Sequence, residues 1–482
     1  MLAELIPSEV TAHGHRRLAA RVRLWPVVAL VIVGLAAGWV VITGMRPAYD
    51  AYGWLVWGHQ ALHLNLNLNA APSWKPLTFL FTLPYALAGQ GAVFLWMLTA
   101  VSGAFAAPLF AARVAYRLAD PVRSRLGAGI AAAFAALGVL GLASYWHFVL
   151  IAVADPLMVA LLLAAIDQHL CGRRKLAWIL LVLLALGRPE AWVLAGGYAA
   201  WAWPREPQMR RALLVGVGVL VVLWFGVSRL SSPSWFVASD VDVRTAPPPP
   251  GNGLVTVMNA YFGLYELPMQ LAGVVALVLA AVRREAIWLA LGSVALAWVL
   301  VDIALGLHGM RVAPRYMFEP AAIMVVLAGA AVGRLLTLSP RPARTLAAVA
   351  LVAFAVVMVP QARERARLAH NGIALGRTWA LVIQRLHTAV GRGQVSRVLA
   401  CGEPLTTVPF QSILAWELGV NVFNVRSVPE QWLRTKRVRL VYFQPFFAGW
   451  RIYPFHARGH ACARLTINTP FTGGTPLASH LP

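Results

Sequence analysis

The sequence predicts an all-α polytopic membrane protein of about 11 membrane helices, a short hairpin pair included, followed by a small C-terminal α/β domain. Apolar residues make up 60% of the 482 residues, charged residues only 12%, and the mean hydropathy is +0.68. Soluble domains carry about 25% charged residues, and water-soluble cores stop growing above ~300 residues. The composition therefore excludes soluble, disordered, coiled-coil and secreted disulfide-rich proteins.

Membrane spans are predicted from the apolar runs. Two short runs, 176–187 and 191–203, flank a Gly-Arg-Pro-Glu sequence and are expected to form a helical hairpin inside the membrane, since twelve residues rise only ~18 Å. The first long run exceeds a cleaved signal peptide and predicts a signal anchor. Nine runs are long enough to cross about 30 Å of hydrocarbon, at 26–44, 91–112, 126–143, 148–170, 212–228, 266–282, 286–306, 318–333 and 345–360.

The basic residues orient these spans. The chain has 41 Lys and Arg against 18 Asp and Glu, a formal net charge of +23. One set of span ends carries 19 Lys and Arg and the opposite set carries 6, so the positive-inside rule predicts a cytoplasmic N-terminus in the inner (cytoplasmic) membrane. The chain then divides into a cytoplasmic N-terminal arm at 1–25, a membrane domain at 26–360 with outer loops 45–90 and 229–265, and an extracytoplasmic α/β domain at 361–482.

The C-terminal domain is predicted from two strand-like runs, 397–401 and 437–443, and an amphipathic helix at 379–390. Cys401 and Cys462 fall in it, and on an oxidising outer face they either form a disulfide or stay free. Cys171 is expected to be a free cytoplasmic thiol. Because this basic domain has no access to the cytoplasm, nucleic acid is excluded as a partner, and the positive charge points to membrane lipid.

The first outer loop holds a candidate catalytic residue. Asp50 is the only acidic residue between Glu9 and Asp120, and it begins an aromatic stretch, with Tyr49 beside it, that suits the headgroup interface. A carboxylate at the membrane surface can deprotonate a hydroxyl acceptor. The alternative role for Asp50 is a helix N-cap.

Lys75, one of only three lysines, closes the same loop. Trp74 and Pro76 are expected to fix it at headgroup depth, where an ammonium is a point-charge partner for a lipid phosphate. The alternative is a lysine that snorkels to the interface. The preceding Leu-Asn alternation at 64–69 has period two and predicts an extended segment, whose asparagines face water or bond sugar hydroxyls.

Ionisable residues at membrane depth are functional hypotheses by default, and three of them are candidates for the site. Asp155 lies inside the 148–170 run and is expected to orient a sugar or to pair with Arg188 of the hairpin. Glu190 accompanies Arg188 at membrane depth. These two residues either line a cavity open to the outer face or neutralise each other.

Two arginines stand at the outer mouth of the 318–333 run. Arg311 and Arg315, the latter followed by Tyr316, either form with Lys75 a clamp for a phosphate or contact lipid headgroups. An Asp-Val-Asp triplet at 240–242 in the second long outer loop leaves a divalent metal as an open alternative. No cofactor is otherwise expected.

The order of these elements resembles a known superfamily. An acidic residue after the first span, a long outer loop, the Lys75-Pro76-Leu77 sequence and a Leu-rich segment resemble the GT-C glycosyltransferases, among them the lipid A aminoarabinose transferase and the protein O-mannosyltransferases. Arg315-Tyr316 at a span start and the Gly-Arg-Pro-Glu hairpin are similar to further elements of that superfamily. The resemblance covers about residues 26–336 in layout, and the C-terminal domain resembles no family.

The resemblance implies a polyprenyl-phosphate sugar donor on the outer face, with Asp50 as the base and Lys75 holding the donor phosphate. The sequence departs from the family pattern at two places. One proline of the family's Lys-Pro-Pro-Leu is missing, and a single Asp50 stands where the family has an acidic pair. The second departure leaves the identity of the base and the need for a metal open.

The predicted function is a GT-C-type membrane glycosyltransferase that moves a hexose or pentose, with inversion by the same resemblance, from polyprenyl phosphate to an envelope glycan, lipid or protein. The alternatives are a flippase or transporter of lipid-linked saccharides, which requires a polar path across the bilayer and two comparable halves, and a non-catalytic subunit for envelope assembly. The expected site residues are Asp50 as catalytic base, Lys75, Arg311 and Arg315 for donor phosphate, and Tyr49, Trp74, Tyr316, Asp155, Arg188 and Glu190 for substrate.

Overall fold

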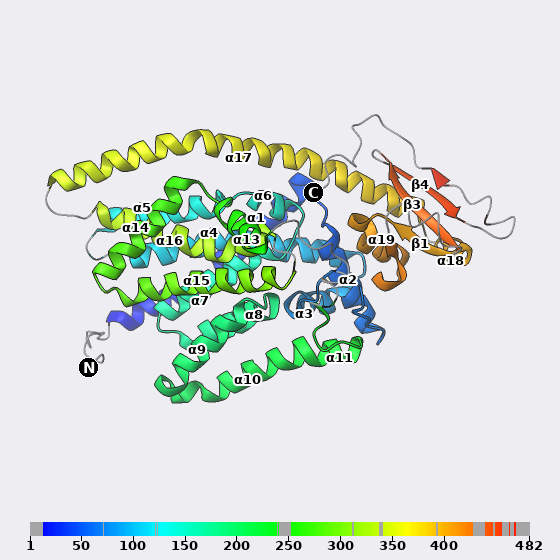
Figure 1. Ribbon diagram of the computed structural model, residues 1–482, viewed down its shortest axis with the longest axis horizontal. Coiled ribbons are helices and arrows are strands. Elements are labelled where there is room, and N and C mark those ends of the chain that lie inside the picture. Colours follow the sequence, from blue (N-terminus) through cyan, green and yellow to red (C-terminus); the bar gives the residue numbers. More distant parts are fainter. Residues whose placement is uncertain are drawn as a thin grey trace.

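The protein is mostly helical, and a small α/β domain lies at one end of an elongated helical bundle (Figure 1). This architecture agrees with the mixture of apolar helices and a C-terminal sheet that the sequence predicts. The computed structural model describes residues 13–70, 72–120, 122, 124–238, 240, 252–310, 313–336, 341–391, 394–427, 439–446, 449–455, 462 and 467–468.

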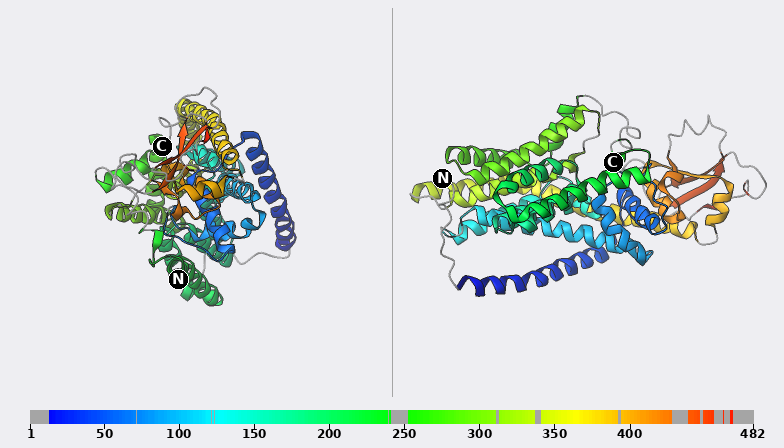
Figure 2. Two further views of the ribbon diagram at one scale, coloured as in Figure 1. Left: turned by 90° about the vertical axis from the view of Figure 1, so that its right-hand side faces the viewer. Right: turned by 90° about the horizontal axis from the view of Figure 1, so that it is seen from below.

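The bundle helices run roughly along the long axis of the molecule, and shorter elements lie where its helices turn or break (Figures 1 and 2). The elements of the bundle are α1 (His13–Thr43), α2 (Tyr49–Leu62), α3 (Pro76–Tyr85), η1 (Ala86–Ala88), α4 (Gly91–Leu118), α5 (Arg125–Leu140), α6 (Tyr145–Leu150), α7 (Asp155–Leu170), α8 (Arg174–Gly187), α9 (Ala191–Arg205), η2 (Pro207–Met209), α10 (Arg210–Val221), η3 (Val222–Gly226), α11 (Val227–Ser231), α13 (Gly253–Phe262), α14 (Leu267–Val282), α15 (Ala286–Leu307), η4 (Pro314–Met317) and α16 (Phe318–Leu335).

Several of these helices are long and apolar enough to cross a membrane. Five single segments of the described chain meet this test. The pair α13 and α14, which is bent by 96°, adds a sixth span if it counts as one. The total of about 11 membrane helices stays a prediction. In the described part of the chain, five segments qualify by length and composition: Leu24–Thr43, Gly91–Leu118, Pro207–Ser231, Ala286–Leu307 and Pro314–Leu335.

The predicted span at 148–170 is wrong as a single helix. Helix α6 ends at Leu150, and α7 begins only at Asp155. Ala152 between them has φ +51°, a conformation that a continuing right-handed helix does not contain. Pro156, at the first turn of α7, lacks the N–H that an unbroken helix would need, so the run is divided here.

The predicted hairpin is confirmed as a pair of short helices. Helix α8 ends at Gly187 and α9 begins at Ala191, with Arg188, Pro189 and Glu190 at the break. Gly187 has no room for a side chain, because an added Cβ would lie 2.4 Å from the Met158 sulfur. The break therefore packs closely against α7.

Helix α16 occupies the centre of the bundle, where it packs against α4, α5, α14 and α15. Its apolar window is 89% buried. A Cβ on Gly333 would lie 2.5 Å from the Gly127 carbonyl oxygen of α5, so glycine is required for this close approach. The start of α16 is thereby held at a fixed depth beside the breaks in α7 and in the hairpin.

Helix α17 (Arg341–Ala389) joins the bundle to the C-terminal domain as one continuous helix across residues 360 and 361. The domain contains a five-stranded sheet of order β2-β1-β3-β4-β5, with β1 parallel to β2 and β3 and the remaining pairs antiparallel. Its other elements are α18 (Val395–Cys401), β1 (Glu403–Thr406), η5 (Val408–Phe410), α19 (Gln411–Leu418), η6 (Val422–Asn424), β2 (Arg426–Ser427), β3 (Leu440–Phe446), β4 (Gly449–Phe455) and β5 (Ile467–Asn468).

The two strand predictions for this domain had different outcomes. The strand expected at 437–443 is present in part as β3. The strand expected at 397–401 is wrong, because this segment lies in helix α18. Val398 and Cys401 are both buried at the i, i+3 spacing of one helix face, which the apolar composition alone did not distinguish from a strand. Cys401 forms a disulfide with Cys462 across 61 residues.

The C-terminal domain contacts the membrane domain mainly through α2. The buried Asn421 side chain donates to Gln60 at 2.9 Å, and the Tyr49 hydroxyl donates to Gln411 at 3.2 Å. At the end of α1, the Trp379 indole of α17 donates to the carbonyl of Pro47 at 3.2 Å. The helix that carries Asp50 is therefore held by the C-terminal domain at its first residue, Tyr49, and near its last turn, at Gln60.

The cysteines provide a test of sidedness. A membrane-impermeant maleimide added to intact cells should leave Cys171 unlabelled, because the positive-inside rule places this thiol in the cytoplasm. Cys401 and Cys462 should react from outside only after reduction, because their disulfide blocks both thiols. Labelling is read by a mass shift on a gel, before and after reduction and before and after permeabilisation.

A Cys171→Ser variant assigns the signals, since it leaves only the disulfide pair. Labelling of Cys171 in intact cells without permeabilisation would reverse the predicted orientation.

Candidate active site

Asp50 lies in the first turn of α2, at the end of the bundle next to the C-terminal domain. The N-cap of α2 is Ala48, and no side chain caps this helix end. The alternative that Asp50 is the N-cap residue is therefore wrong. Its carboxylate instead lies 3.1 Å from the Arg315 guanidinium, and each of the two side chains is about one-fifth exposed. This ion pair joins α2 to the turn that precedes α16.

Arg315 lies in η4, the single turn that precedes α16. Besides Asp50, it approaches Asp155, with 4.0 Å between Arg315 Nε and the nearer carboxylate oxygen. Its guanidinium also lies over the rings of Tyr316 and Phe148, at 5.5 and 5.9 Å from the centroids. Arg315 is thus a partly exposed cation placed between two carboxylates.

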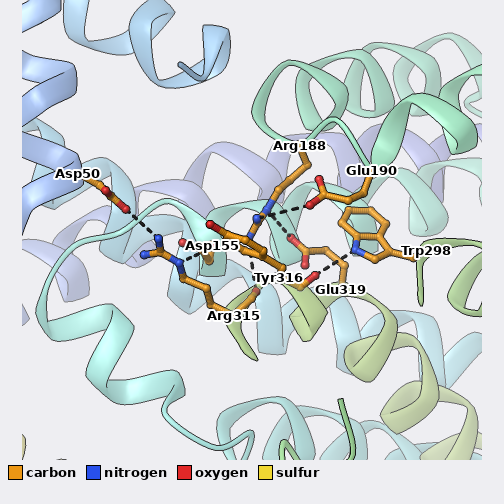
Figure 3. Close-up of polar contacts among 8 residues, drawn as sticks. All are labelled: Asp50, Asp155, Arg188, Glu190, Trp298, Arg315, Tyr316 and Glu319. Carbon is orange, nitrogen blue, oxygen red and sulfur yellow. Dashed lines mark hydrogen bonds and ion pairs between the residues drawn. The ribbon is translucent and has the colours of Figure 1, made fainter. Parts of the chain in front are cut away.

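Arg188 lies in the hairpin break, and Figure 3 shows its side chain directed toward a group of carboxylates and the turn that holds Arg315. The Arg188 side chain is 2% exposed and forms an ion pair with Asp155, which is one of the two roles that the sequence left open for that residue. It also reaches Glu319 at 3.7 Å and Glu190 at 3.9 Å. A buried guanidinium needs such partners because an unpaired charge in the interior is strongly destabilising.

Two further contacts connect Arg188 to the Arg315 turn. Arg188 donates a hydrogen bond to the carbonyl oxygen of Arg315 at 3.3 Å, and its guanidinium lies 4.5 Å from the centroid of the Tyr316 ring. The carbonyl of Tyr316 accepts from the Trp298 indole of α15 at 3.0 Å. The backbone of η4 is therefore held from two sides, which fixes where its arginine side chain emerges (Figure 3).

Lys75 is the N-cap residue of α3 and is only 7% exposed. Its ammonium lies 5.5 Å from the centroid of the Trp54 ring. Burial lowers the pKa of Lys75 to about 8; Asp155 and Asp50 raise this pKa, and Arg188 and Arg315 lower it further. Because it responds to these four charges, Lys75 belongs to the same electrostatic cluster as the Asp50–Arg315 pair.

Two other predicted site residues have packing partners outside this cluster. The Trp74 indole is buried, donates to the carbonyl of Leu223 at 3.2 Å and packs at a tilt against Trp57, with 5.6 Å between the ring centroids. The Tyr49 hydroxyl is directed to Gln411 of the C-terminal domain. The structure thus brings Asp50, Lys75, Asp155, Arg188, Glu190, Arg315 and Tyr316 together, but not Trp74.

The remaining sequence candidates are Arg311 and the Asp-Val-Asp triplet at 240–242. Arg311 and Asp242 fall outside the described residues. Asp240 accepts a hydrogen bond from the Ser234 hydroxyl. Within the part of the chain that the structure describes, no group of three or more His, Cys, Asp or Glu residues could hold a metal ion.

Sequence reasoning missed two acidic residues beside Arg188. Glu319 in α16 and Asp302 in α15 are both fully buried. Among the described residues, Asp302 has no cation within 4.0 Å, whereas Glu319 has Arg188. The signal was present, because each is an acidic residue close to or within a predicted apolar span, where ionisable groups are uncommon.

No protein-family model and no curated protein matches the chain. Among solved structures, it is similar to ArnT from Cupriavidus metallidurans in the apo state, with 16% identity, a TM-score of 0.47, and coverage of 89% of this chain and 93% of that one. It is also similar to the Archaeoglobus fulgidus oligosaccharyltransferase tethered with an acceptor peptide, with 13% identity, a TM-score of 0.42, and coverage of 85% and 65%. Both are GT-C glycosyltransferases, the superfamily that the sequence resembles.

The buried ion pairs predict that two variants, each of which removes one buried ionisable group, differ strongly in their free energy of unfolding. Arg188→Met leaves Glu319 buried without its cation and Asp155 with only the more distant Arg315, and it should lower the free energy of unfolding by about 3–5 kcal/mol. Thermal unfolding in detergent measures the effect.

Asp302→Asn is the matched control, since it replaces an equally buried carboxyl group, which has no cation within 4.0 Å among the described residues, by an amide of similar shape. It should change the free energy of unfolding by less than about 1 kcal/mol. Equal melting temperatures for the two variants would contradict the structural role of Arg188.

Proposed function

We propose that the chain is a membrane glycosyltransferase that transfers a sugar from a polyprenyl-phosphate donor to an envelope acceptor on the outer face of the cytoplasmic membrane. The observation that carries the proposal is the Asp50–Arg315 pair, partly exposed at 3.1 Å, with the Lys75 ammonium in the same charge cluster. This arrangement offers one carboxylate for a proton and two cations for a phosphate. Transfer of a sugar from a phosphate leaving group requires both a proton acceptor and cations of this kind.

In the proposed reaction, the acceptor hydroxyl gives its proton to the Asp50 carboxylate while its oxygen attacks the anomeric carbon of the donor sugar. The bond between that carbon and the phosphate oxygen breaks, and the electron pair leaves with the polyprenyl phosphate. Arg315 and Lys75 stabilise the negative charge that develops on the phosphate. Preorganised charges of this type are commonly worth a few kcal/mol.

The deeper residues are positioning residues in this proposal. Arg188 bonds to the backbone of Arg315 and to Asp155, and Glu319 and Glu190 balance its charge. None of these side chains is more than 4% exposed. Their depth suits them to hold Arg315 in place rather than to contact the acceptor.

A flippase of lipid-linked saccharides is the alternative function. Such a protein needs a polar path through the bilayer. Among the described residues, the buried carboxylates Asp155, Glu190, Asp302 and Glu319 gather near Arg188, while Asp167 is neutralised separately by Arg113 and Arg117. Two separate groups, rather than one continuous polar path among the described residues, favour a transferase with one outer site.

The catalytic role of Asp50 predicts that Asp50→Asn lowers turnover by about 10²- to 10⁴-fold, because the amide cannot accept the proton of the acceptor hydroxyl. Donor binding should be retained, since the neutral amide has no charge that competes for Arg315. The measurement is transfer from a radiolabelled polyprenyl-phosphate sugar by purified protein in lipid vesicles.

Asp240→Asn is the control, because it removes an aspartate from the other long outer loop, where the side chain bonds to Ser234. This variant should keep its turnover. If Asp50→Asn turned over as fast as the unchanged protein, Asp50 would not be the base.

The lowered pKa of Lys75 predicts that donor affinity falls as the pH rises through about 8. Below that pH the ammonium is protonated and attracts the donor phosphate, and above it the amine is neutral. The donor is a phosphodiester, whose own charge stays constant over this range. Binding of the donor, titrated between about pH 7 and 9.5, measures the effect.

Lys75→Met should bind the donor more weakly and lose this pH dependence. A donor affinity that falls in the same way in Lys75→Met would assign the titration to another group and remove Lys75 from the phosphate site.

A further inference from the structure

A cavity lies far from the Asp50 site, between α1 and the rest of the bundle. Helix α1 stands at the edge of the bundle in Figure 2, and only 17% of its apolar window, Leu24–Thr43, is buried. Trp25 of this cavity is 18 residues before Thr43, the end of α1 near Asp50, which corresponds to about 27 Å along the helix. The cavity therefore lies toward the opposite end of the bundle, the end predicted to be cytoplasmic.

The deeper part of this cavity is an apolar groove of about 910 Å³. Its walls come from α1, α4, α7 and α8, and they are mainly alanine, leucine, isoleucine, valine and aromatic side chains, with Gln168 and Arg173 shared with the neighbouring cavity. Acyl chains of lipid fit such a surface through van der Waals packing. A soluble anion would leave this apolar surface uncovered.

The mouth of the groove is a basic cavity of about 1330 Å³. The two cavities share wall residues, among them Trp25, Leu109 and Gln168, so they adjoin. No acidic residue is among the described residues that line the mouth, whereas four arginines are: Arg113, Arg117, Arg125 and Arg173.

Two of these arginines are fixed in place by a buried carboxylate. Asp167 of α7 is fully buried and forms ion pairs with Arg113 at 3.0 Å and with Arg117 at 2.9 Å. The Arg113 guanidinium also lies 4.7 Å from the centroid of the Trp25 ring. One carboxylate neutralises one of the two positive charges, so this pair retains a net charge of about +1 at the mouth.

The other two arginines are exposed and have no carboxylate within 4.0 Å among the described residues. Arg125 begins α5, and Arg173 precedes α8 and lines both the mouth and the groove. Gln168 lies between groove and mouth, is 5% exposed, and donates to Asp167 at 3.0 Å. Its side-chain oxygen has no hydrogen-bond partner in the described chain, which leaves an acceptor for a hydroxyl of a ligand.

We propose that this cavity binds an anionic glycerophospholipid, with its acyl chains in the groove beside α1, its phosphate at Arg125 and Arg173, and a headgroup hydroxyl directed to Gln168. Charge complementarity selects the anion, and the adjoining apolar groove selects a lipid over a soluble phosphate. The site is separate from the proposed transferase site and does not depend on that activity.

The test measures binding of phosphatidylglycerol to the purified full-length protein in detergent, by native mass spectrometry. The double variant Arg125→Ser/Arg173→Ser should bind this lipid roughly 10-fold more weakly, because two cations near the phosphate are lost. Phosphatidylcholine with the same chains should bind more weakly than phosphatidylglycerol to the unchanged protein and be insensitive to the double variant.

The matched control is Arg211→Ser/Arg284→Ser, which removes two exposed arginines from the same end of the bundle outside both cavities. An equal loss of phosphatidylglycerol in this control would show general surface attraction and overturn the site. Unchanged binding in Arg125→Ser/Arg173→Ser would overturn it as well.

A third arm separates lipid from soluble phosphate. Ala29→Trp places a large ring in the groove wall on α1 and should weaken phosphatidylglycerol binding while the arginines remain. If glycerol 3-phosphate bound as tightly as the lipid, or if Ala29→Trp had no effect, the cavity would be a site for a soluble anion and the proposal would fail.

Discussion

One buried guanidinium connects the interrupted helices at the end of the bundle that carries Asp50. Arg188 cannot be buried without partners, and its partners come from three places where helices are interrupted: Asp155 at the start of α7, Glu319 at the start of α16, and Glu190 before α9. An apolar chain gains nothing from breaking helices in lipid, because every freed backbone group must be satisfied again. The ion pairs at Arg188 explain why these breaks lie side by side.

The partly exposed site follows from this buried network. Because Arg188 bonds to the backbone carbonyl of Arg315, the Arg315 side chain leaves η4 from a fixed position. On the other side, the C-terminal domain holds α2 through Asn421 and the Tyr49 hydroxyl, which positions Asp50. The 3.1 Å contact between Asp50 and Arg315 is therefore the meeting point of two separately anchored elements.

The sequence was sufficient where a property depends on local pattern. Composition predicted a helical membrane protein, and the short hairpin and the Asp155–Arg188 pair followed from rare polar residues in apolar runs. It was insufficient where the property depends on packing. Asp50 and Arg315 are 265 positions apart, so no local pattern links them, and α18 was mistaken for a strand because seven apolar-rich residues suit either structure. Glu319 was detectable as an acidic residue in an apolar run, but only its contact with Arg188 assigns it to this cluster.

Under the proposed function, the Asp50–Arg315 ion pair also determines the order of events. A carboxylate oxygen that contacts a guanidinium is not free to accept the proton of a hydroxyl. A donor phosphate competes for that guanidinium and has a second cation in Lys75, so its binding releases the carboxylate beside the reacting sugar. The base thus becomes available when the donor is present. An acceptor that arrives first finds Asp50 occupied, which favours binding of the donor before activation of the acceptor.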